Sequence, residues 1–324
     1  FAVFFLFPAS ALLAKTNTEA GDIIEPDGNA AEELAKASQN PVANIISLPL
    51  ENNLDFGVGS EDARVNTLNL KPVYPVNLGK LNLINRVIAP LVYQQERFDG
   101  EGSQSGLGNI TYQAFLSPAA PSKIIWGLGP ALILPTNTDD RLGGDKWSAG
   151  PALVVLAKPG HWLFGTLVQH FWSFAGDSDE NNVNLSSLQY FINYNFPTGW
   201  YLTTNPTMTA NWDEGSSDRY TIPVGGGAGR IVRFSGRPVD FKLQGFWNAE
   251  KPDNAAGLRL SSSTGWTRTS TFLHVTQASS PLDHGIVRVT EVGVEPTKSP
   301  RPQRDRFASL RTRSFSSSGS GSRT

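Results

Sequence analysis

The sequence of 324 residues lacks cysteine altogether and has one methionine and four histidines. Without cysteine, disulfide frameworks, zinc–thiolate sites and thiol catalysis are excluded. Charged residues are also scarce, at 17%, and the formal net charge of −2 gives no reason to expect nucleic acid as a partner. Apolar residues amount to only 39%, little for a compact core. Instead the chain holds 31 glycines, 22 prolines, 18 phenylalanines and eight tryptophans, a mixture typical of strands joined by turns.

Long apolar runs are missing as well, with one exception at the beginning. Residues 1–14 (FAVFFLFPASALLA) are apolar and end in small residues, which predicts the remnant of a secretory signal peptide. A run of this length is shorter than the roughly 20 residues that a membrane-spanning helix needs. The alternative is a buried first strand. Residues 15–41 are expected to form a polar leader with a short helix at 30–38, ended by Asn40-Pro41.

The dominant signal between residues 42 and 257 is an alternation of apolar and polar residues with period two. In 45–58, for example, Leu48, Leu50 and Leu54 occupy one face and Glu51 and Asn53 the other. This alternation predicts strands with two unlike faces. We expect eleven strand segments, at 45–58, 64–76, 80–93, 109–118, 123–136, 146–158, 161–175, 187–196, 200–212, 219–232 and 239–247.

The length of these segments favours a membrane barrel over a soluble sandwich. Strands of soluble sheets are most often about 5–6 residues long, whereas a tilted strand that crosses a membrane needs about 9–11. Several segments carry aromatic residues near their ends, where a membrane barrel has its interfacial girdles. The connections also alternate between short neutral or basic turns and longer acidic loops. The predicted fold class is therefore an all-β, antiparallel transmembrane β-barrel occupying residues 42–257.

The carboxyl-terminal end conflicts with this prediction. Barrels of this kind have an even number of strands, so a twelfth strand is expected near Gly257. Leu258-Arg259-Leu260 begins one, but Ser261–Gly265 (SSSTG) breaks the alternation. Residues 258–324 hold ten Lys and Arg against four Asp and Glu, whereas the whole chain holds 27 against 29. We therefore expect the last strand to be missing or corrupted and residues 258–324 to be a disordered, out-of-frame tail.

Four segments resemble a known family. Residues 38–56, 123–151, 170–179 and 191–212 are similar to bacterial outer-membrane barrels that are described as transporters, named after the MetA protein of a phenol-degradation pathway, and sometimes mislabelled neuromedin U. The similarity covers about residues 31–254. It implies an outer-membrane barrel of about 12 strands that takes part in solute uptake. The departure after Leu258 affects the last strand, which in the family is amphipathic and ends near an aromatic residue.

The sequence holds little that indicates catalysis. His161 and His170 belong to strand segments, and neither is accompanied by the serine pattern of a Ser–His hydrolase. The glycine run 225–229 lacks the spacing of a phosphate-binding loop. The acidic stretch 177–181 resembles the start of a calcium loop, but position 182 is Asn and position 188 is Leu. We predict no enzymatic activity, catalytic residue, metal site or cofactor.

The candidates for contact with a solute are polar residues on the face expected to line the lumen. Amide and hydroxyl groups offer hydrogen bonds without strong selection by charge; the alternative is that they only fill and hydrate the interior. The predicted lumen-facing residues are Glu51, Asn53, Asp55, Lys71, Gln113, Gln189, Asn193, Asn195, Thr203, Asn205, Asp240, Lys242 and Gln244.

The resulting hypothesis is a porin-like channel in the outer membrane of a Gram-negative cell. It would pass small solutes passively, hydrophobic and aromatic ones among them. The expected partners are outer-membrane lipid, lipopolysaccharide, the barrel-assembly machinery and an unidentified small solute, but no nucleic acid. The alternatives are a structural or adhesive barrel without transport and a secreted soluble β-sandwich.

Overall fold

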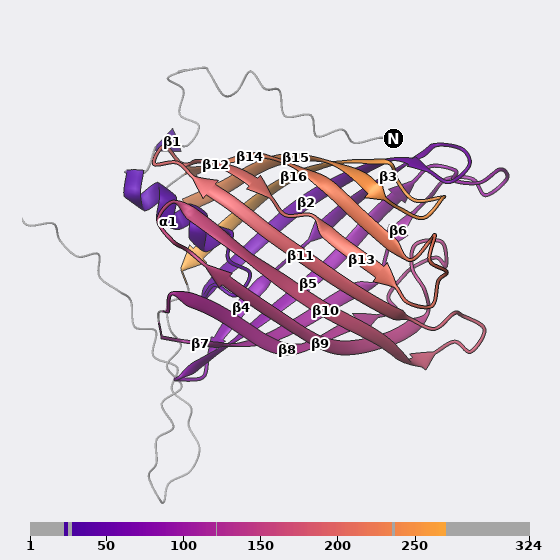
Figure 1. The fold of residues 1–324 in the computed structure, drawn as a ribbon, viewed down its shortest axis with the longest axis horizontal. Helices are drawn as coiled ribbons and strands as arrows, with labels where there is room; N and C mark the ends of the chain where they lie inside the picture. The colour runs from indigo at the N-terminus through magenta and orange to yellow at the C-terminus, as the bar shows by residue number, and fades with distance from the viewer. Residues whose placement is uncertain (1–22, 25–27, 121, 235–236, 270–324) are drawn as a thin grey trace, which may run out of the picture. The chain divides into compact units, whose positions relative to one another are not determined.

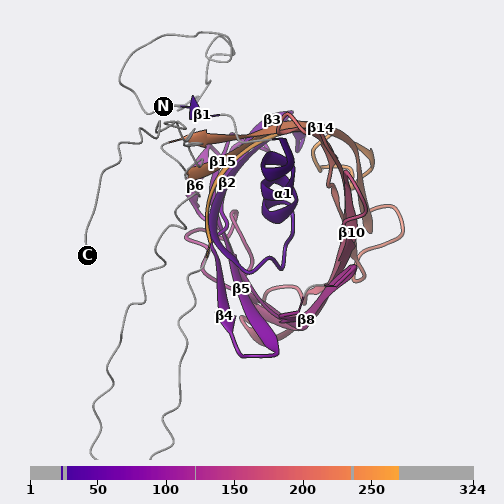
Figure 2. The ribbon, with the colours of Figure 1, turned by 90° about the vertical axis from the view of Figure 1, so that its left-hand side faces the viewer.

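The described part of the chain forms a closed antiparallel β-barrel of 12 strands (Figures 1 and 2). The computed structural model describes residues 23–24, 28–120, 122–234 and 237–269. The predicted signal peptide at 1–14 therefore lies outside the described residues. Among the described residues, no helix has the length and apolar character needed to cross a membrane. The elements are β1 (Ile23–Ile24), α1 (Gly28–Ser38), β2 (Ile45–Val58), β3 (Ala63–Leu70), β4 (Val73–Asn77), β5 (Leu81–Gln94), β6 (Gln104–Leu107), β7 (Ile110–Pro118), β8 (Ile124–Leu134), β9 (Lys146–Ala157), β10 (Trp162–Gly176), β11 (Asn184–Asn195), β12 (Trp200–Thr204), β13 (Thr207–Asn211), β14 (Tyr220–Phe234), β15 (Arg237–Glu250) and β16 (Leu258–Thr269).

Each of the eleven predicted strand segments corresponds to a strand of the barrel. Three barrel strands are interrupted, so that β3 with β4, β6 with β7, and β12 with β13 each make one crossing. The connections alternate as predicted. Residues 78–80, 158–161 and 196–199 form short turns at one end, where β7 and β14 also end. Residues 95–103, 135–145, 177–183, 212–219 and 251–257 form longer connections at the other end, where the connection 59–62 is short. We call these the short-turn end and the long-loop end.

The prediction of a missing last strand is wrong. β16 pairs with β15 from Val239↔Trp266 to Trp247↔Leu258, and with β2 over its whole length, so it closes the barrel. The boundary expected at residue 257 therefore moves to Thr269, and the rest of the predicted tail lies outside the described residues. Serine and glycine interrupt the apolar alternation but still offer backbone N–H and C=O groups. A spanning sheet has to pair all of these groups, because lipid offers no hydrogen bonds.

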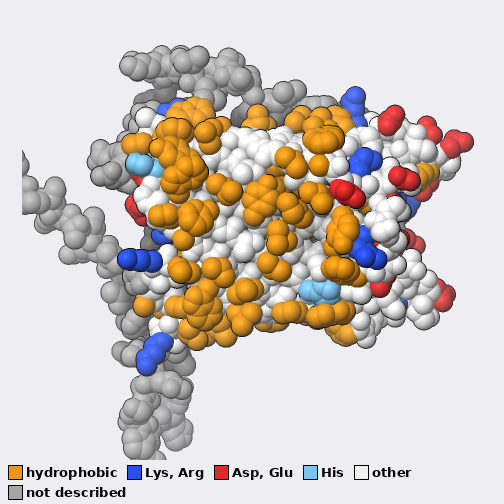
Figure 3. Space-filling model, in the orientation of Figure 1, with side chains coloured by type: hydrophobic (Ala, Val, Ile, Leu, Met, Phe, Trp, Pro, Cys, Tyr) orange, Lys and Arg blue, Asp and Glu red, His pale blue; other side chains and the backbone are white. Residues whose placement is uncertain are grey.

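The outer surface of the barrel is apolar and carries every tryptophan of the chain. All eight are 39–60% exposed, the reverse of their usual position in soluble proteins. Four lie toward the short-turn end and four toward the long-loop end, as the two interfacial girdles of a membrane barrel require. The first group is Trp126, Trp162, Trp200 and Trp266, and the second is Trp147, Trp172, Trp212 and Trp247. Figure 3 shows apolar side chains along the wall and acidic side chains gathered at the long-loop end.

The helix α1 lies within the ring of strands at the short-turn end (Figures 1 and 2). It ends at Ser38 as predicted and begins at Gly28, two residues before the predicted start. Ala35 is fully buried against Tyr201 of β12 and Ile231 of β14. Farther along the chain, Val42 packs among inward-facing side chains of the barrel. From α1 onward, the leader is thus part of the barrel interior.

Candidate functional site: the barrel lumen

The inner face of β2, β5, β15 and β16 and the bend between β3 and β4 carry charged side chains, and we call this surface the charged wall. Its members come together because neighbouring strands place inward residues side by side. Ser263 of β16, for example, pairs with Lys242 of β15 on one side and with Glu51 of β2 on the other. The charged wall consists of Glu51, Asp55, Lys71, Arg86, Asp240, Lys242 and Arg259.

Two ion pairs hold the charged wall together. Lys71 Nζ lies 2.6 Å from Glu51 Oε1, which also accepts a hydrogen bond from Asn53 Nδ2 at 3.3 Å. Arg259 donates to both oxygens of Asp55, from Nε at 2.7 Å and from a terminal nitrogen at 2.9 Å. The second pair joins β16 to β2 at the closing seam. Arg259 is not among the predicted lumen residues, because the sequence pattern places residue 259 in the tail.

Asp240 and Lys242 complete the charged wall on β15. The hydroxyl of Tyr201 donates to Asp240 Oδ1 at 2.7 Å, and the Tyr201 side chain is almost fully buried. Lys242 interacts electrostatically with both Asp240 and Glu51. Each carboxylate on this wall therefore has a hydrogen-bond donor or a cation beside it, as groups inside a membrane protein require.

The predicted amide and hydroxyl residues also face inward. Gln244 Nε2 donates to Asn205 Oδ1 at 2.6 Å, and Gln189 Nε2 donates to the Asn205 carbonyl oxygen at 3.1 Å. This contact passes over β14, where Gly227 lies between Thr203 and Gln244 in the ladder. A Cβ atom at Gly227 would collide with the carbonyl oxygen of Leu243, so the glycine allows close approach of the strands.

Of the remaining predicted residues, Asn193, Thr203 and Asn195 lie apart from the charged wall. Asn193 and Thr203 are neighbours on β11 and β12, and both are buried. Asn195 is fully buried at the short-turn end. Gln113 of β7 adjoins the charged wall, because it pairs with Arg86 in the ladder, and it donates from Nε2 to Gln169 Oε1 at 2.6 Å. The thirteen candidates thus line several parts of the lumen and do not form one cluster.

The opposite part of the lumen is apolar, which sequence analysis did not predict. Inward side chains of β5 and β7 to β11 form one buried cluster, which we call the apolar wall. In 146–158 and 161–175 both faces of the strand are rich in apolar residues, so the alternation there is weak and the inner face could not be distinguished. The described members of the apolar wall on the strands are Ile84, Phe115, Ala131, Ala152, Val154, Leu156, Leu163, Leu167, Phe171 and Phe191.

Polar contacts attach α1 and the residues after it to the short-turn end. Glu32 Oε1 lies 2.6 Å from Lys36 Nζ, and Glu32 Oε2 lies 2.9 Å from His161 Nδ1 in the turn before β10. Gln39 exchanges two amide hydrogen bonds with Asn195, at 2.8 and 3.2 Å. Burial by itself would raise the pKa of Glu32, but the hydrogen bonds and positive charges of Lys36 and His161 outweigh it and lower this pKa.

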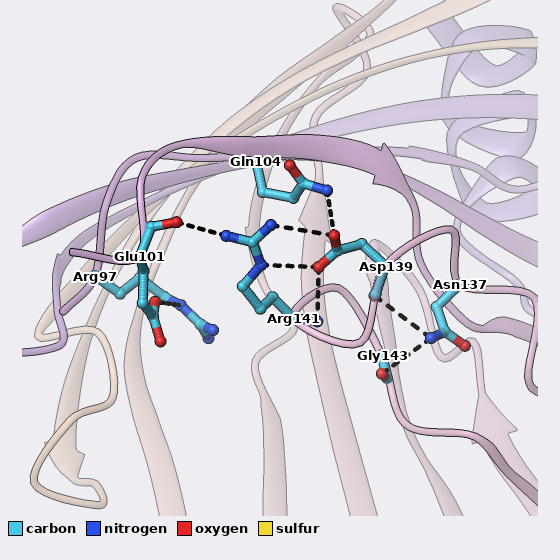
Figure 4. Close-up of polar contacts among 7 residues, drawn as sticks. All are labelled: Arg97, Glu101, Gln104, Asn137, Asp139, Arg141 and Gly143. Atoms are coloured by element: carbon cyan, nitrogen blue, oxygen red, sulfur yellow. Dashed lines mark hydrogen bonds and ion pairs between the residues drawn. The ribbon is translucent and has the colours of Figure 1, made fainter.

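At the long-loop end, an arginine–aspartate pair connects two loops (Figure 4). Arg141 binds Asp139 through Nε at 2.8 Å and a terminal nitrogen at 3.1 Å, and it donates to the carbonyl oxygen of Glu101 at 2.6 Å. Gln104 also donates to Asp139. The hydrogen bonds from Arg141 lower the pKa of Asp139. The loops 95–103 and 135–145 are therefore held together at neutral pH.

The comparison with protein families matches residues 49–263 to the family described as "Putative MetA-pathway of phenol degradation". This match covers more than half of the chain. The chain belongs to this family. No curated protein sequence matches it.

The family assignment agrees with a solved structure. The crystal structure of an outer membrane channel from Pseudomonas putida F1 is similar with a TM-score of 0.52 and 17% identity, over 69% of this chain and 94% of that chain. The β domain of the Bordetella autotransporter BrkA matches with a TM-score of 0.40 and 10% identity, over 69% of this chain and all of that chain. Outer membrane phospholipase A from Escherichia coli matches with a TM-score of 0.36 and 13% identity, over 68% of this chain and 95% of that chain. The match to the Pseudomonas channel shows that the two chains share the barrel fold.

Outside the lumen of this family member, His170 Nδ1 lies 2.7 Å from Ser186 Oγ on the face that carries Trp172. The same serine oxygen accepts a hydrogen bond from Trp212 Nε1 at 2.8 Å. His170 Nε2 has no hydrogen-bond partner among the described residues, so no third group orients the ring. Through Ser186, His170 is thus linked to Trp212, and its ring lies against Trp172; both tryptophans belong to the girdle at the long-loop end. Within the described ranges, no three acidic or histidine side chains gather as a metal site would need.

Proposed function

We propose that this protein is a passive channel for small solutes in the outer membrane. The observation that carries the proposal is the division between the two faces of the barrel. The outer face is apolar with two tryptophan girdles, whereas the inner face holds ion pairs, amides and hydroxyls. A barrel of 12 strands is intermediate between small barrels filled by side chains and the wide 16-stranded porins. Such a lumen suits small molecules rather than polymers.

The presence of both a charged wall and an apolar wall favours the passage of solutes that are partly apolar. An apolar ring can lie against the side chains of the apolar wall, while the charged wall and the amides hydrogen-bond polar groups of the solute. Hydrophobic and aromatic solutes with one polar substituent fit this division. The proposal also includes export by a signal peptide, insertion by the barrel-assembly machinery, and contact of the acidic long-loop end with lipopolysaccharide.

The test is a liposome swelling assay with variants that narrow the lumen. Asn205→Trp and Gln244→Trp place large side chains on the inner face, where the two amides meet. We expect each substitution to reduce the rate of solute entry several-fold. Leu243→Trp is the matched control, because Leu243 is 64% exposed on the outer face beside Gln244, and it should leave the rate unchanged.

Folding of each variant is checked by its heat-modifiable migration on gels. If the native protein passes no solute in swelling or conductance measurements, the channel is wrong and a structural or adhesive barrel remains. If Leu243→Trp slows solute entry as much as Asn205→Trp and Gln244→Trp do, the proposal that solutes pass along the inner face is wrong. Purification as a monodisperse protein without detergent would contradict the membrane barrel itself.

A further inference from the structure

The charged wall has one cation more than it has carboxylates. Lys71 pairs with Glu51 and Arg259 with Asp55. Lys242 lies in the electrostatic field of Asp240 as well as Glu51. Neither Lys242 nor Arg86 forms a direct ion pair among the described residues, but only Arg86 also has a buried nitrogen without a hydrogen-bond partner there. Its guanidinium interacts with Glu51 at longer range, without an ion pair or hydrogen bond among the described residues, and its buried Nε has no partner.

Glu51 contacts Lys71 and Asn53 rather than Arg86. One of its oxygens binds both Lys71 and Asn53. An arginine partly removed from water and lacking a bidentate partner costs free energy unless something else accepts its hydrogen bonds. Guanidinium groups bind carboxylates through two parallel N–H···O bonds, and this geometry is where arginine differs from lysine.

Arg86 lies where the charged wall meets the apolar wall. On β5 it is two residues from Ile84, which belongs to the apolar wall and pairs with Phe115 of β7. Its own partners in the ladder are Gln113 of β7 and Val73 of β4. A molecule whose carboxylate reaches Arg86 therefore has an apolar surface beside it for the rest of its body.

We propose that the channel selects small apolar carboxylates, aromatic ones included, and that Arg86 is the residue that binds their carboxylate group. The inference rests on the proposed channel function and names its solute class. The charged wall has four cations and three carboxylates, and this excess of one positive charge matches a monoanion. The carboxylate oxygens accept from the guanidinium, and the apolar body lies along Ile84 and Phe115. The binding has to be weak enough for release, since a channel that holds its solute tightly does not conduct.

The experiment compares two solutes of similar size and shape, benzoate and the neutral benzyl alcohol. Their entry into proteoliposomes is measured for the native channel and for Arg86→Gln, Arg86→Lys and Lys80→Gln. Lys80 is exposed in the turn before β5, so Lys80→Gln removes one positive charge outside the lumen. We expect Arg86→Gln to lower benzoate entry several-fold and to leave benzyl alcohol entry nearly unchanged. Arg86→Lys should recover part of the benzoate rate, and Lys80→Gln should match the native protein.

A second measurement is the reversal potential of a single channel in a KCl gradient. Arg86→Gln should shift it toward cation selectivity, whereas Lys80→Gln should shift it much less. If the native channel passes both solutes but Arg86→Gln slows them equally or not at all, the role of Arg86 is wrong and the channel function stands. If the native channel passes neither solute, the proposed function fails with it. Heat-modifiable migration shows that each variant has formed a barrel.

Discussion

Glu32 shows how a single ionisable side chain can fix the leader at the mouth of the barrel. Its two oxygens bind Lys36 on the same helix and His161 on the barrel turn, so it joins the two. Glu33 is the other acidic residue that contacts Lys36. Because Glu32 has a lowered pKa in the folded protein, its ionised form stabilises the docked helix.

This contribution has a definite dependence on pH. It is fully present above the ordinary glutamate pKa of about 4.3 and is lost as the pH falls through the lower pKa of the folded state. We expect hydrogen exchange of the α1 amides to accelerate on acidification. In Glu32→Gln the exchange should already be faster at neutral pH and should depend less on pH. Glu33→Gln is the control, because the Glu33 side chain is 67% exposed and its ion pair among the described residues is with Lys36 of the same helix. Equal exchange in the native protein and Glu32→Gln would contradict this role.

At the scale of elements, β16 decides whether the barrel closes. It lies between β15 and β2, and its inward Arg259 also binds Asp55 of β2. Outward Leu258, Leu260 and Trp266 are each at least 43% exposed, so the strand is amphipathic in spite of its serines. The aromatic residue near its end, Trp266, is the feature that the family resemblance predicts.

Proline at Ser262 tests the pairing of β16. Ser262 is exposed on the outer face and lies between Leu243 and Asn52 in the ladder. Ser262→Pro removes a backbone donor from the middle of a strand that is paired on both sides. We expect it to abolish heat-modifiable migration. Ser262→Leu keeps the backbone donor and adds an apolar side chain facing lipid, so it should fold at least as well as the native protein. A heat-modifiable Ser262→Pro barrel would show that β16 is dispensable.

At the scale of the whole described barrel, the position of the tryptophans has a direct spectroscopic consequence. All eight lie on the outer face in two girdles near the strand ends, where aromatic rings meet the headgroup region. In vesicles with brominated lipids, we expect strong quenching of tryptophan fluorescence. Bromine near the headgroups should quench more than bromine near the acyl chain ends. Quenching by a water-soluble agent alone would contradict the girdles and place the tryptophans in water.

Much of the architecture was predictable because alternation is a local property. Each of the eleven segments follows from residues within one strand, and the polar residues of 45–58, 187–196 and 239–247 alternate with apolar ones clearly enough to assign their faces. Two features were not predictable. The first is the outer face of β16, which is polar at Ser262 and Thr264. The second is the pairing of β16 with β2, which lies about 200 residues earlier in the chain.

The amino-acid sequence alone determined the all-β class, the membrane-spanning length of the strands and the side of each clearly alternating strand, because these depend on neighbours two residues apart. Only the tertiary structure decided which inner faces meet around the barrel. Closure by β16, the docking of α1, the apolar wall opposite the charged wall and the unmatched Arg86 all depend on strands far apart in the chain. Their physical reason is that a spanning sheet has to close to satisfy its backbone, and closure sets which side chains share the interior.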